Sequence, residues 1–441
     1  MLRRIVFGLG LLSATMLSQS VSAETPHTLQ IIVSKDAQSM TVYDGAQVIA
    51  TSRVSTGKAG HTTPSGIFSI LEKRKYHESN IYSNAPMPFM QRLTWSGIAL
   101  HEGNVPNYPA SHGCIRLPRD FAKTLFGMTD RGVHVVVSDA PVKPVQITHA
   151  NLFTPLKPMP TEPLMSDIEL RPTVKRASPG PYEVAMNSSE QATDMMTTAS
   201  VSPENAAPLR MLIKRRDQRD TIRDVQAMLT ELGFETGTHD GIAGTMTRSA
   251  VAGFKRWKNL PTSGEFLTQD FLQALYLSSG REEPPAAQLL IRQSFRPVFE
   301  LPIGLKTPEI PLGTHFFTAR DVDRSRESAE WHVLTLQNVL GAAEKKRMGI
   351  RPDAFASTAT EALDRLEIPA AAREKVATLL NEGASLTITD EGLGPETGKG
   401  TDFITLTRSQ PKVATVEPAS AETPRKRKSS SRTYPSGVGL Y

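Results

Sequence analysis

A proline-rich segment divides the sequence into parts that must fold separately. Residues 141–208 contain eleven prolines in 68 positions, mixed with Ser, Thr, Glu and Ala, and show no sustained hydrophobic periodicity. Such a composition cannot bury enough apolar surface to offset the conformational entropy lost on folding. We therefore expect a Pro-rich linker over 141–208, and the 441-residue chain has room for several domains around it.

Residues 1–23 have the pattern of a secretory signal peptide. Arg3 and Arg4 supply positive charge, residues 5–17 form an apolar stretch, and Ala23 ends a small-residue cleavage motif. This stretch is shorter than the roughly 20 apolar residues that a membrane-spanning helix needs. We expect an exported, periplasmic protein without a transmembrane segment after signal cleavage. An uncleaved anchor is the alternative.

The basic charge of the chain is concentrated at its C-terminal end. Removal of Arg3 and Arg4 with the signal lowers the formal net charge from +5 to +3, and five basic residues lie at 425–428 and 432. The remaining body is therefore slightly acidic, which gives no support to nucleic-acid binding. We expect residues 409–441 to be a disordered basic tail. It either contacts an anionic membrane or wall polymer or is simply solvated.

Three blocks have the patterns of folded domains, so the predicted fold class is multidomain. Residues 28–140 contain short β-type runs, a hairpin signal at Asp44-Gly45 and one or two helices, which predicts a β-rich domain. Residues 218–278 contain three short amphipathic segments, which predict a small three-helix bundle. Residues 288–408 mix helical and strand patterns and predict an α+β C-terminal block.

The C-terminal block repeats the spacing of proline, glycine and aspartate residues that is found in the first block. Proline, glycine and aspartate recur with the same spacings of 14 and 7 residues, and residues 63–68 have a counterpart at 310–316. The matched positions are Pro118 and Pro369, Gly132 and Gly383, and Asp139 and Asp390. We therefore hypothesise a diverged, inactive copy of the first domain, inactive because it lacks cysteine. Chance matching is the alternative.

Cys114 is the only cysteine of the chain, which excludes a disulfide framework, a multi-cysteine zinc finger and a cysteine-ligated iron–sulfur cluster. His101 and His112 lie within thirteen residues of it. An imidazole beside a thiol can lower its pKa and make it a nucleophile. Gly113 allows a tight backbone turn whose amides could face an oxyanion. Arg116 could hold a substrate carboxylate.

Two other interpretations of this run remain open. Cys114 could be an inert packing residue, although its polar neighbours argue against that. A zinc site formed by His101, His112 and Cys114 is chemically possible. The spacing matches no zinc pattern, and we predict neither a metal nor a cofactor.

Ser111-His112-Gly113-Cys114, with His101 upstream and the segment 63–68, resembles the L,D-transpeptidase (YkuD-like) catalytic domain over about residues 29–139. The resemblance implies a β-sandwich-like fold and acyl transfer from a peptidoglycan stem peptide through a cysteine thioester. By that scheme Cys114 is the nucleophile and His101 is a base oriented by a backbone carbonyl. His112 and Gly113 shape the pocket, Ser111 supports the loop, and Arg116 helps to bind substrate. The short spacing between His101 and Ser111 departs from the family pattern and predicts a short loop beside the site.

The helical block resembles the peptidoglycan-binding domain 1 family. The matching residues include Val225-Gln226, Leu232-Gly233-Phe234, Ala250-Val251 and the glycine-rich turn 240–244. Lys255 stands where the family commonly has Gln, which puts the carbohydrate contacts in doubt.

The segment 73–95 is rich in Tyr, Asn, Pro and Met, which suggests either a lid over the site or an ordinary surface loop. Within it, Tyr82 and Phe89 are the candidate substrate-binding residues.

Together these features predict a periplasmic, wall-associated L,D-transpeptidase of cell wall biogenesis that acts on peptidoglycan stem peptides while its helical domain binds the glycan polymer through a long linker. Hydrolysis by water, giving a carboxypeptidase, and transfer to a lysine of an envelope protein are alternative outcomes of the same thioester. A wall-binding scaffold without catalysis is the remaining alternative.

Overall fold

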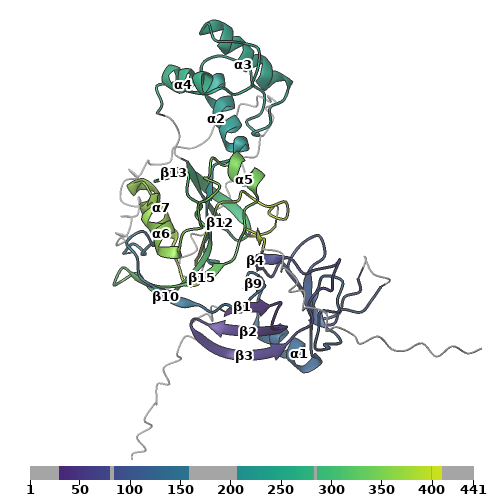
Figure 1. Ribbon diagram of the computed structural model, residues 1–441. Helices are drawn as coiled ribbons and strands as arrows, with labels where there is room; N and C mark the ends of the chain where they lie inside the picture. Colours follow the sequence, from purple (N-terminus) through teal and green to yellow (C-terminus); the bar gives the residue numbers. More distant parts are fainter. Residues whose placement is uncertain (1–28, 80–83, 158–205, 283–285, 399, 410–441) are drawn as a thin grey trace, which may run out of the picture.

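The structure is a computed structural model that describes residues 29–79, 84–157, 206–282, 286–398 and 400–409. The predicted signal peptide, most of the predicted linker and nearly all of the predicted tail lie outside these residues. In the described part of the chain, no helix combines the length and the apolar character needed to cross a bilayer. Figure 1 shows three units: an N-terminal β domain, a C-terminal β-sheet domain and a helical module at the far end.

The N-terminal domain is built on a six-stranded sheet with the order β18-β4-β9-β1-β2-β3. The Asp44-Gly45 hairpin forms as predicted, with φ of +62° at Gly45. Helix α1 packs its apolar face, which includes Ala122 and Leu125, against the core. The bounds are β1 Leu29–Ser34, β2 Ser39–Asp44, β3 Gln47–Arg53, β4 Ser65–Ser69, α1 Arg119–Met128, β9 His134–Ser138 and β18 Thr405–Thr407.

A second, four-stranded sheet with the order β5-β6-β7-β8 lies across the same core. Its strands are β5 Glu72–Arg74, β6 Met90–Arg92, β7 Ala99–Glu102 and β8 Ile115–Leu117. Leu100, Ile115 and Leu117 are fully buried and belong to the same cluster as Ile31 and Val135 of the larger sheet. The two sheets therefore enclose one hydrophobic core, which agrees with the β-rich, sandwich-like fold that the sequence predicts.

The C-terminal domain is an eight-stranded sheet with the order β10-β15-β14-β17-β11-β12-β13-β16. Its strands are β10 Val145–Ile147, β11 Arg210–Arg215, β12 Ala287–Gln293, β13 Arg296–Leu305, β14 Thr314–Asp323, β15 Ser328–Leu336, β16 Leu366–Glu367 and β17 Ser385–Thr389. Three short helices accompany the sheet: α5 Ala342–Arg347, α6 Ala359–Asp364 and α7 Ala370–Leu379.

The structure differs from the predicted linker at both of its ends. Strand β10 pairs antiparallel with β15, and Phe153 is buried in the core of the C-terminal domain. The indole of Trp331 donates a hydrogen bond of 3.0 Å to the carbonyl of Phe153. At the other end the carbonyls of Ala206 and Ala207 accept hydrogen bonds from the side-chain amide of Asn381. The sequence pattern did not reveal these short segments, because prolines surround them. They are ordered in the structure because they contact parts of the C-terminal domain that are distant in sequence.

The six-stranded sheet of the N-terminal domain and the eight-stranded sheet of the C-terminal domain have the same topology in their central strands. In each, an antiparallel meander (β1-β2-β3 or β11-β12-β13) is joined through its first strand to a parallel strand that follows a helix (β9 or β17). That strand pairs antiparallel with β4 or with β14. The helix begins after Pro118 in one domain and after Pro369 in the other, with nearly identical φ and ψ at the two prolines. The C-terminal block is thus β-rich, and its order and strand directions match the hypothesis of a diverged copy.

The pairing registers refine the sequence match. Phe68 of β4 lies opposite Val135 of β9, and Phe317 of β14 lies opposite Leu386 of β17. Counted from the shared glycine and aspartate, Phe317 corresponds to Phe68, whereas the sequence match had placed Phe316 there. Among the described residues, the C-terminal domain has no counterpart of the β5–β8 sheet.

The helical module is inserted between β11 and β12 of the C-terminal sheet. It consists of α2 Gln218–Glu231, α3 Thr245–Trp257 and α4 Gln269–Ser278. Helix α2 begins with a capping box formed by Asp217 and Asp220. Asp220 also pairs with Lys214, a buried lysine of β11. This ion pair ties the first helix of the module to the sheet.

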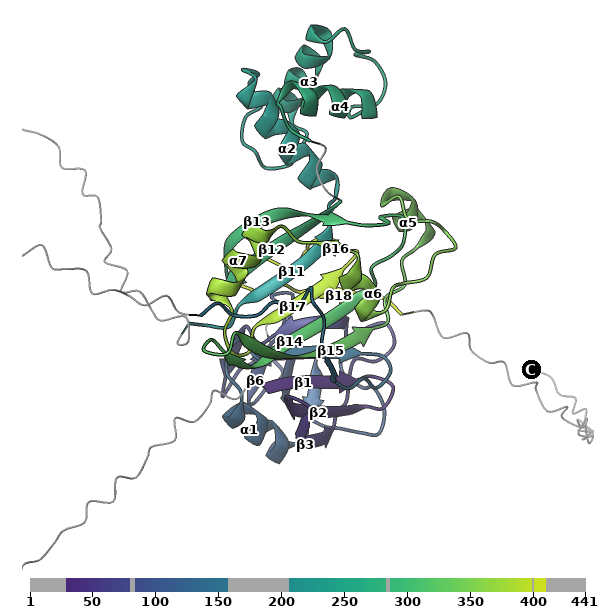
Figure 2. The same cartoon turned by 90° about the vertical axis from the view of Figure 1, so that its left-hand side faces the viewer.

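The N- and C-terminal domains pack directly on each other (Figure 2). Ile67 and Val136 of one sheet form a buried cluster with Phe316, Leu334 and Leu336 of the other. Strand β18 crosses back and pairs antiparallel with β4, and the adjacent Ile404 enters the core of the N-terminal domain. Residues 158–205 of the predicted linker lie outside the described residues, while the domains on either side of it are in contact. The module is carried by a domain that is itself docked.

Candidate active site

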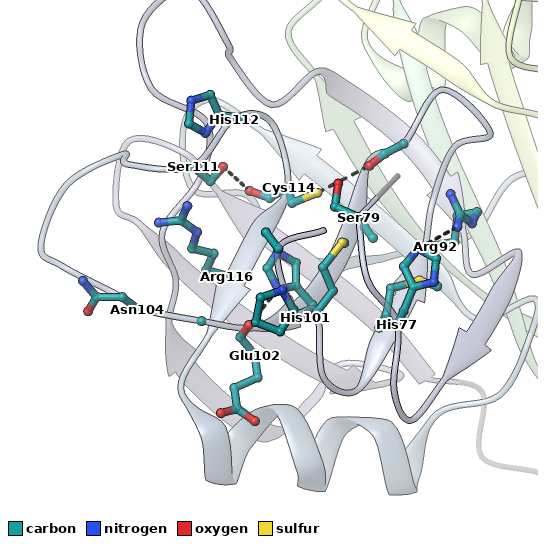
Figure 3. A pocket seen from close by; sticks show the side chains of 17 residues that line it. His77, Ser79, Arg92, His101, Glu102, Asn104, Ser111, His112, Cys114 and Arg116 are labelled. Atoms are coloured by element: carbon teal, nitrogen blue, oxygen red, sulfur yellow. Dashed lines mark hydrogen bonds between the residues drawn. The ribbon is translucent and has the colours of Figure 1, made fainter. Parts of the chain in front are cut away.

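A cavity of about 360 Å³ opens on one face of the four-stranded sheet and contains Cys114 (Figure 3). It brings together five of the predicted site residues: His101, Ser111, His112, Cys114 and Arg116. The segment predicted as a lid contributes to the wall as well. The wall residues from that segment are His77, Ser79, Ala85, Pro86, Met87, Met90 and Arg92.

Strand register explains why these side chains meet. His101 of β7 lies beside Arg116 of the parallel strand β8, and Arg92 of β6 lies opposite Ala99 of β7. The same β7–β8 register, continued by one residue, places Cys114 beside Ala99. Because side chains alternate between the two faces of a strand, Arg92, Ala99, His101, Cys114 and Arg116 share one face.

Burial makes the resting Cys114 thiol weakly acidic. Desolvation raises the pKa of the thiol, while a hydrogen bond from the Ala99 amide and the charges of Arg116 and Arg92 oppose this effect. The thiol also lies 3.4 Å from the carbonyl of Gly97, an acceptor for the S–H group. The sequence suggested a thiolate favoured by a neighbouring imidazole. In the structure the neutral thiol is the favoured form.

His101 is held as a neutral base. Its Nδ1 lies 2.6 Å from the carbonyl oxygen of Glu102, and because a carbonyl can only accept, Nδ1 must carry the proton. This leaves Nε2 as the free lone pair. Burial lowers the pKa of His101 to about 4, and the hydrogen bond to Glu102 opposes that shift only in part. At neutral pH the ring can therefore accept a proton from a thiol.

The turn before Cys114 is fixed by three hydrogen bonds. The Ser111 hydroxyl donates to the carbonyl of Cys114 and accepts from the amide of Gly113 at 3.1 Å. Gly113 has a φ of +122°, which strongly favours glycine, and its carbonyl accepts from the Thr63 hydroxyl at 2.7 Å. Since the Gly113 amide is engaged by Ser111, its place in the structure is that of a loop support. The expected oxyanion contact of this amide is not seen.

His112 lies at the exposed rim of the cavity. Its ring meets that of His61 edge to face, with 4.9 Å between the centroids. Figure 3 shows it turned away from the thiol. Arg116, in contrast, extends along the cavity wall, where its aliphatic stem would meet any side chain added at Gly103. This position suits the predicted contact with substrate.

Tyr82 and Phe89 were the candidate substrate-binding residues of the segment 73–95. Tyr82 lies outside the described residues. Phe89 does not line the cavity: its ring packs against Phe126 of helix α1, with 5.8 Å between the centroids. An aromatic residue on the back of this loop is a core anchor, so the predicted substrate contact of Phe89 is not supported.

Sequence reasoning missed several residues of the site. Arg92 faces the cavity, and Thr63 holds the turn from a distance of fifty residues. The signal for Thr63 was the motif at 63–68, but its role emerges only from tertiary contact. In the part of the chain that the structure describes, no cluster of three or more His, Cys, Asp or Glu residues is arranged to hold a metal.

The helical module has a polar centre that explains its sequence pattern. The amide side chain of Gln226 accepts from the amide of Gly241 and donates to Asp240, to the carbonyl of Ile242 and to Thr247. It thus folds the glycine-rich turn onto α2. Lys255 is buried and its Nζ donates to the carbonyl of Glu265 at 3.0 Å, which is a structural contact.

Comparisons with known proteins give separate matches for the N-terminal β domain and for the helical module. Residues 29–137 match the family model described as the L,D-transpeptidase catalytic domain, YkuD, and residues 218–280 match that of a putative peptidoglycan binding domain. No curated protein matches the chain.

Several solved structures are similar over about a quarter of the chain. An L,D-transpeptidase from Mycobacterium smegmatis is 24% identical over 25% of this chain and 58% of its own, with a TM-score of 0.24. One from Stackebrandtia nassauensis is 28% identical over 26% and 57%, also with a TM-score of 0.24. One from Enterococcus faecium is 26% identical over 25% and 49%, with a TM-score of 0.23. This chain thus spans about half the length of the structures that it resembles.

The similarity of this chain to known families thus lies in two regions: residues 29–137 are similar to YkuD L,D-transpeptidase catalytic domains, and residues 218–280 to putative peptidoglycan binding domains.

Proposed function

We propose that the protein is a periplasmic peptidoglycan L,D-transpeptidase of cell wall biogenesis that cross-links stem peptides through a Cys114 thioester. The observation that carries this proposal is that Cys114 and His101, a neutral base, line one cavity in the region that matches the YkuD family model. The predicted signal at residues 1–23 supports export. The peptidoglycan binding module supports the polymer as the substrate.

The first half-reaction forms the thioester. The neutral thiol of Cys114 gives its proton to Nε2 of His101 as sulfur attacks the carbonyl carbon of the amide before the terminal D-alanine. The C–N bond then breaks, and the leaving amine takes the proton from His101. Because both groups are neutral at rest, proton transfer accompanies the attack and does not precede it.

The second half-reaction restores the enzyme. An amine of a neighbouring stem peptide, such as that of a diamino acid, attacks the thioester carbonyl and gives its proton to Nε2 of His101. The C–S bond breaks, and the proton returns to the sulfur of Cys114. Water in place of the amine would give a trimmed peptide, and a protein lysine would give an anchored protein.

The docked domains support an acceptor on the same polymer. The helical module is inserted into a sheet that packs on the catalytic domain, so the module and the cavity are held in one assembly. Binding of the module to the wall would therefore keep the cavity close to many stem peptides at once.

Incubation of donor muropeptides with the wild type and with Cys114→Ala tests the proposal. We expect mass analysis to show cross-linked dimers and released D-alanine with the wild type and neither with Cys114→Ala. Trimmed monomers alone would identify a carboxypeptidase. Products linked to an added envelope protein would identify an anchoring enzyme. No Cys114-dependent product of any kind would favour the wall-binding scaffold.

A further inference from the structure

Arg92 places a second cation at the site, on the side of Cys114 away from Arg116. Figure 3 shows the thiol between the two arginines. Arg92 is two strands from Cys114, since β7 lies between them, so the two backbones are about 10 Å apart. The residue between them on this face is Ala99, whose methyl group leaves the floor of the cavity open.

The guanidinium of Arg92 is oriented by a carboxylate outside the cavity lining. Its Nε donates to Glu72 at 2.9 Å, and its side chain is only 15% exposed. Glu72 is shared with Arg74, whose Nε and Nη2 both lie 2.6 Å from the same carboxylate oxygen. One glutamate thus serves two arginines, and Glu78 is a further carboxylate close enough to act on His77. Nε2 of His77 lies 3.4 Å from Nη2 of Arg92, and the ring adds no positive charge of its own, because burial and the charges of Arg92 and Arg74 lower its pKa.

The cavity wall differs in character along its length. Met87 and Met90 are buried and form one cluster with Ala99 and Cys114, and Ser79 is buried beside the exposed Ala85 and Pro86. Beyond Arg116 the wall consists of Asn104 and His112, both exposed. A donor attached to a polymer can extend over this exposed wall, which directs its short free end toward Arg92.

We propose that Arg92 binds the terminal carboxylate of the donor peptide and thereby selects donors that keep a free carboxylate one residue beyond the scissile amide. This inference rests on the proposed function, since it names a specificity determinant of that reaction. The short end of such a donor is a single amino acid with one negative charge. It fits a subsite that presents the guanidinium of Arg92, whereas Arg116 contacts the part of the donor that continues toward the polymer.

Two donors that differ only at this carboxylate test the proposal: a stem tetrapeptide ending in D-alanine and the same peptide ending in D-alaninamide. We expect the wild type to use the acid with a kcat/KM about 10- to 100-fold higher, the range for a lost charge-assisted hydrogen bond. Arg92→Gln should lower kcat/KM for the acid by a similar factor and leave the amide within about twofold. Arg92→Lys should retain part of the preference, because it restores the charge without the fork of donors.

Arg74→Gln is the matched control. It removes an arginine from the same glutamate, but Arg74 is outside the cavity and its side chain is 58% exposed. It should keep the wild-type preference for the acid. Arg116→Gln should weaken both donors equally and so also keep the preference.

The outcomes separate this inference from the proposed function. Equal losses for both donors in Arg92→Gln would show that Arg92 acts only through the fold or the thiol, and would overturn the inference. A preference erased by Arg116→Gln would assign the carboxylate to Arg116 instead, with the same consequence. A wild type that uses acid and amide equally well would overturn the inference alone. A wild type without Cys114-dependent turnover of either donor would overturn the proposed function and this inference with it.

Discussion

The hydroxyl of Thr63 donates a hydrogen bond of 2.7 Å to the carbonyl of Gly113, the residue before the candidate nucleophile. The same hydroxyl accepts from the amide of Gly57 at 2.9 Å. Thr63 is fully buried and directly precedes the segment that leads into β4. Thr63 therefore fixes the turn that carries Cys114 relative to the six-stranded sheet of the N-terminal domain.

Thr63→Val should weaken catalysis and stability together. Valine has the same shape but leaves the Gly113 carbonyl and the Gly57 amide without this partner, at a cost of about 1–3 kcal/mol for each buried group. We expect a loss of at least about tenfold in kcat and a lower midpoint of thermal unfolding. Thr63→Ser keeps the hydroxyl and should restore most of both. If Thr63→Val retained full kcat, the turn would not depend on this contact.

The acid limb of the pH profile should lie unusually low. His101 must be neutral to accept the thiol proton, and burial lowers its pKa to about 4, compared with about 6.5 for an exposed histidine. Activity should thus be present above about pH 4 and be lost as the pH falls through that value. The pH dependence of kcat/KM measures this, because it reports the free enzyme. An acid limb near pH 6.5 would contradict the buried, neutral state of the ring.

Alkylation by iodoacetamide should show the complementary behaviour of Cys114. This reagent needs the thiolate, and burial raises the pKa of the thiol above its usual value. We expect the alkylation rate at neutral pH to be slower than that of free cysteine and to rise steeply on the alkaline side. Rapid alkylation at pH 6 would indicate a preformed thiolate instead.

Gly66→Ala should displace β18 from the six-stranded sheet of the N-terminal domain. A Cβ at Gly66 would lie 2.2 Å from the carbonyl oxygen of Thr405, and φ at this position is +152°. Loss of the strand would expose Ile404, so we expect destabilisation by about 2–4 kcal/mol, measured by denaturant unfolding. Gly127→Ala is the control: nothing lies within 4 Å of its Cβ in helix α1, and the substitution should be neutral or stabilising. Equal effects of the two changes would argue against the clash.

Asp220→Ala should lower the stability of the contact between helix α2 and strand β11. It leaves Lys214 buried, with only Asp217 nearby at 3.6 Å, and breaking a buried ion pair typically costs about 3–5 kcal/mol. Thermal unfolding should show this loss. The double change Lys214→Met with Asp220→Leu should recover much of it, because it removes both charges. Arg326→Ala breaks an exposed pair with Asp323 and should cost less than about 1 kcal/mol.

Local signals predicted the parts of this protein that depend on near neighbours. The Asp44-Gly45 hairpin, helix α1 and strand β9 follow from turn chemistry and hydrophobic periodicity within about ten residues. Cys114 and His101 could be identified because they lie in one short run, and the structure brings them into one cavity.

The parts that sequence reasoning missed depend on distant pairing. Strands β10 and β18 have only three residues each and gain their stability from β15 and β4, which lie far away in the chain. Arg92 could not be placed beside the site without the register of β6 on β7. The role of Phe89 was misjudged because aromatic residues serve cores as readily as binding sites, and sequence alone does not give the direction of the ring.

The insertion of the helical module at a hairpin turn has a consequence for how such a protein can change. Arg215 and Ala287 pair directly at the end of β11 and β12, so the chain leaves and re-enters the sheet at adjacent positions. A different module, or a two-residue turn, could occupy this place without altering a strand pairing of the sheet. The helical module and the cavity that contains Cys114 can therefore be exchanged or altered independently, even though one continuous chain carries both.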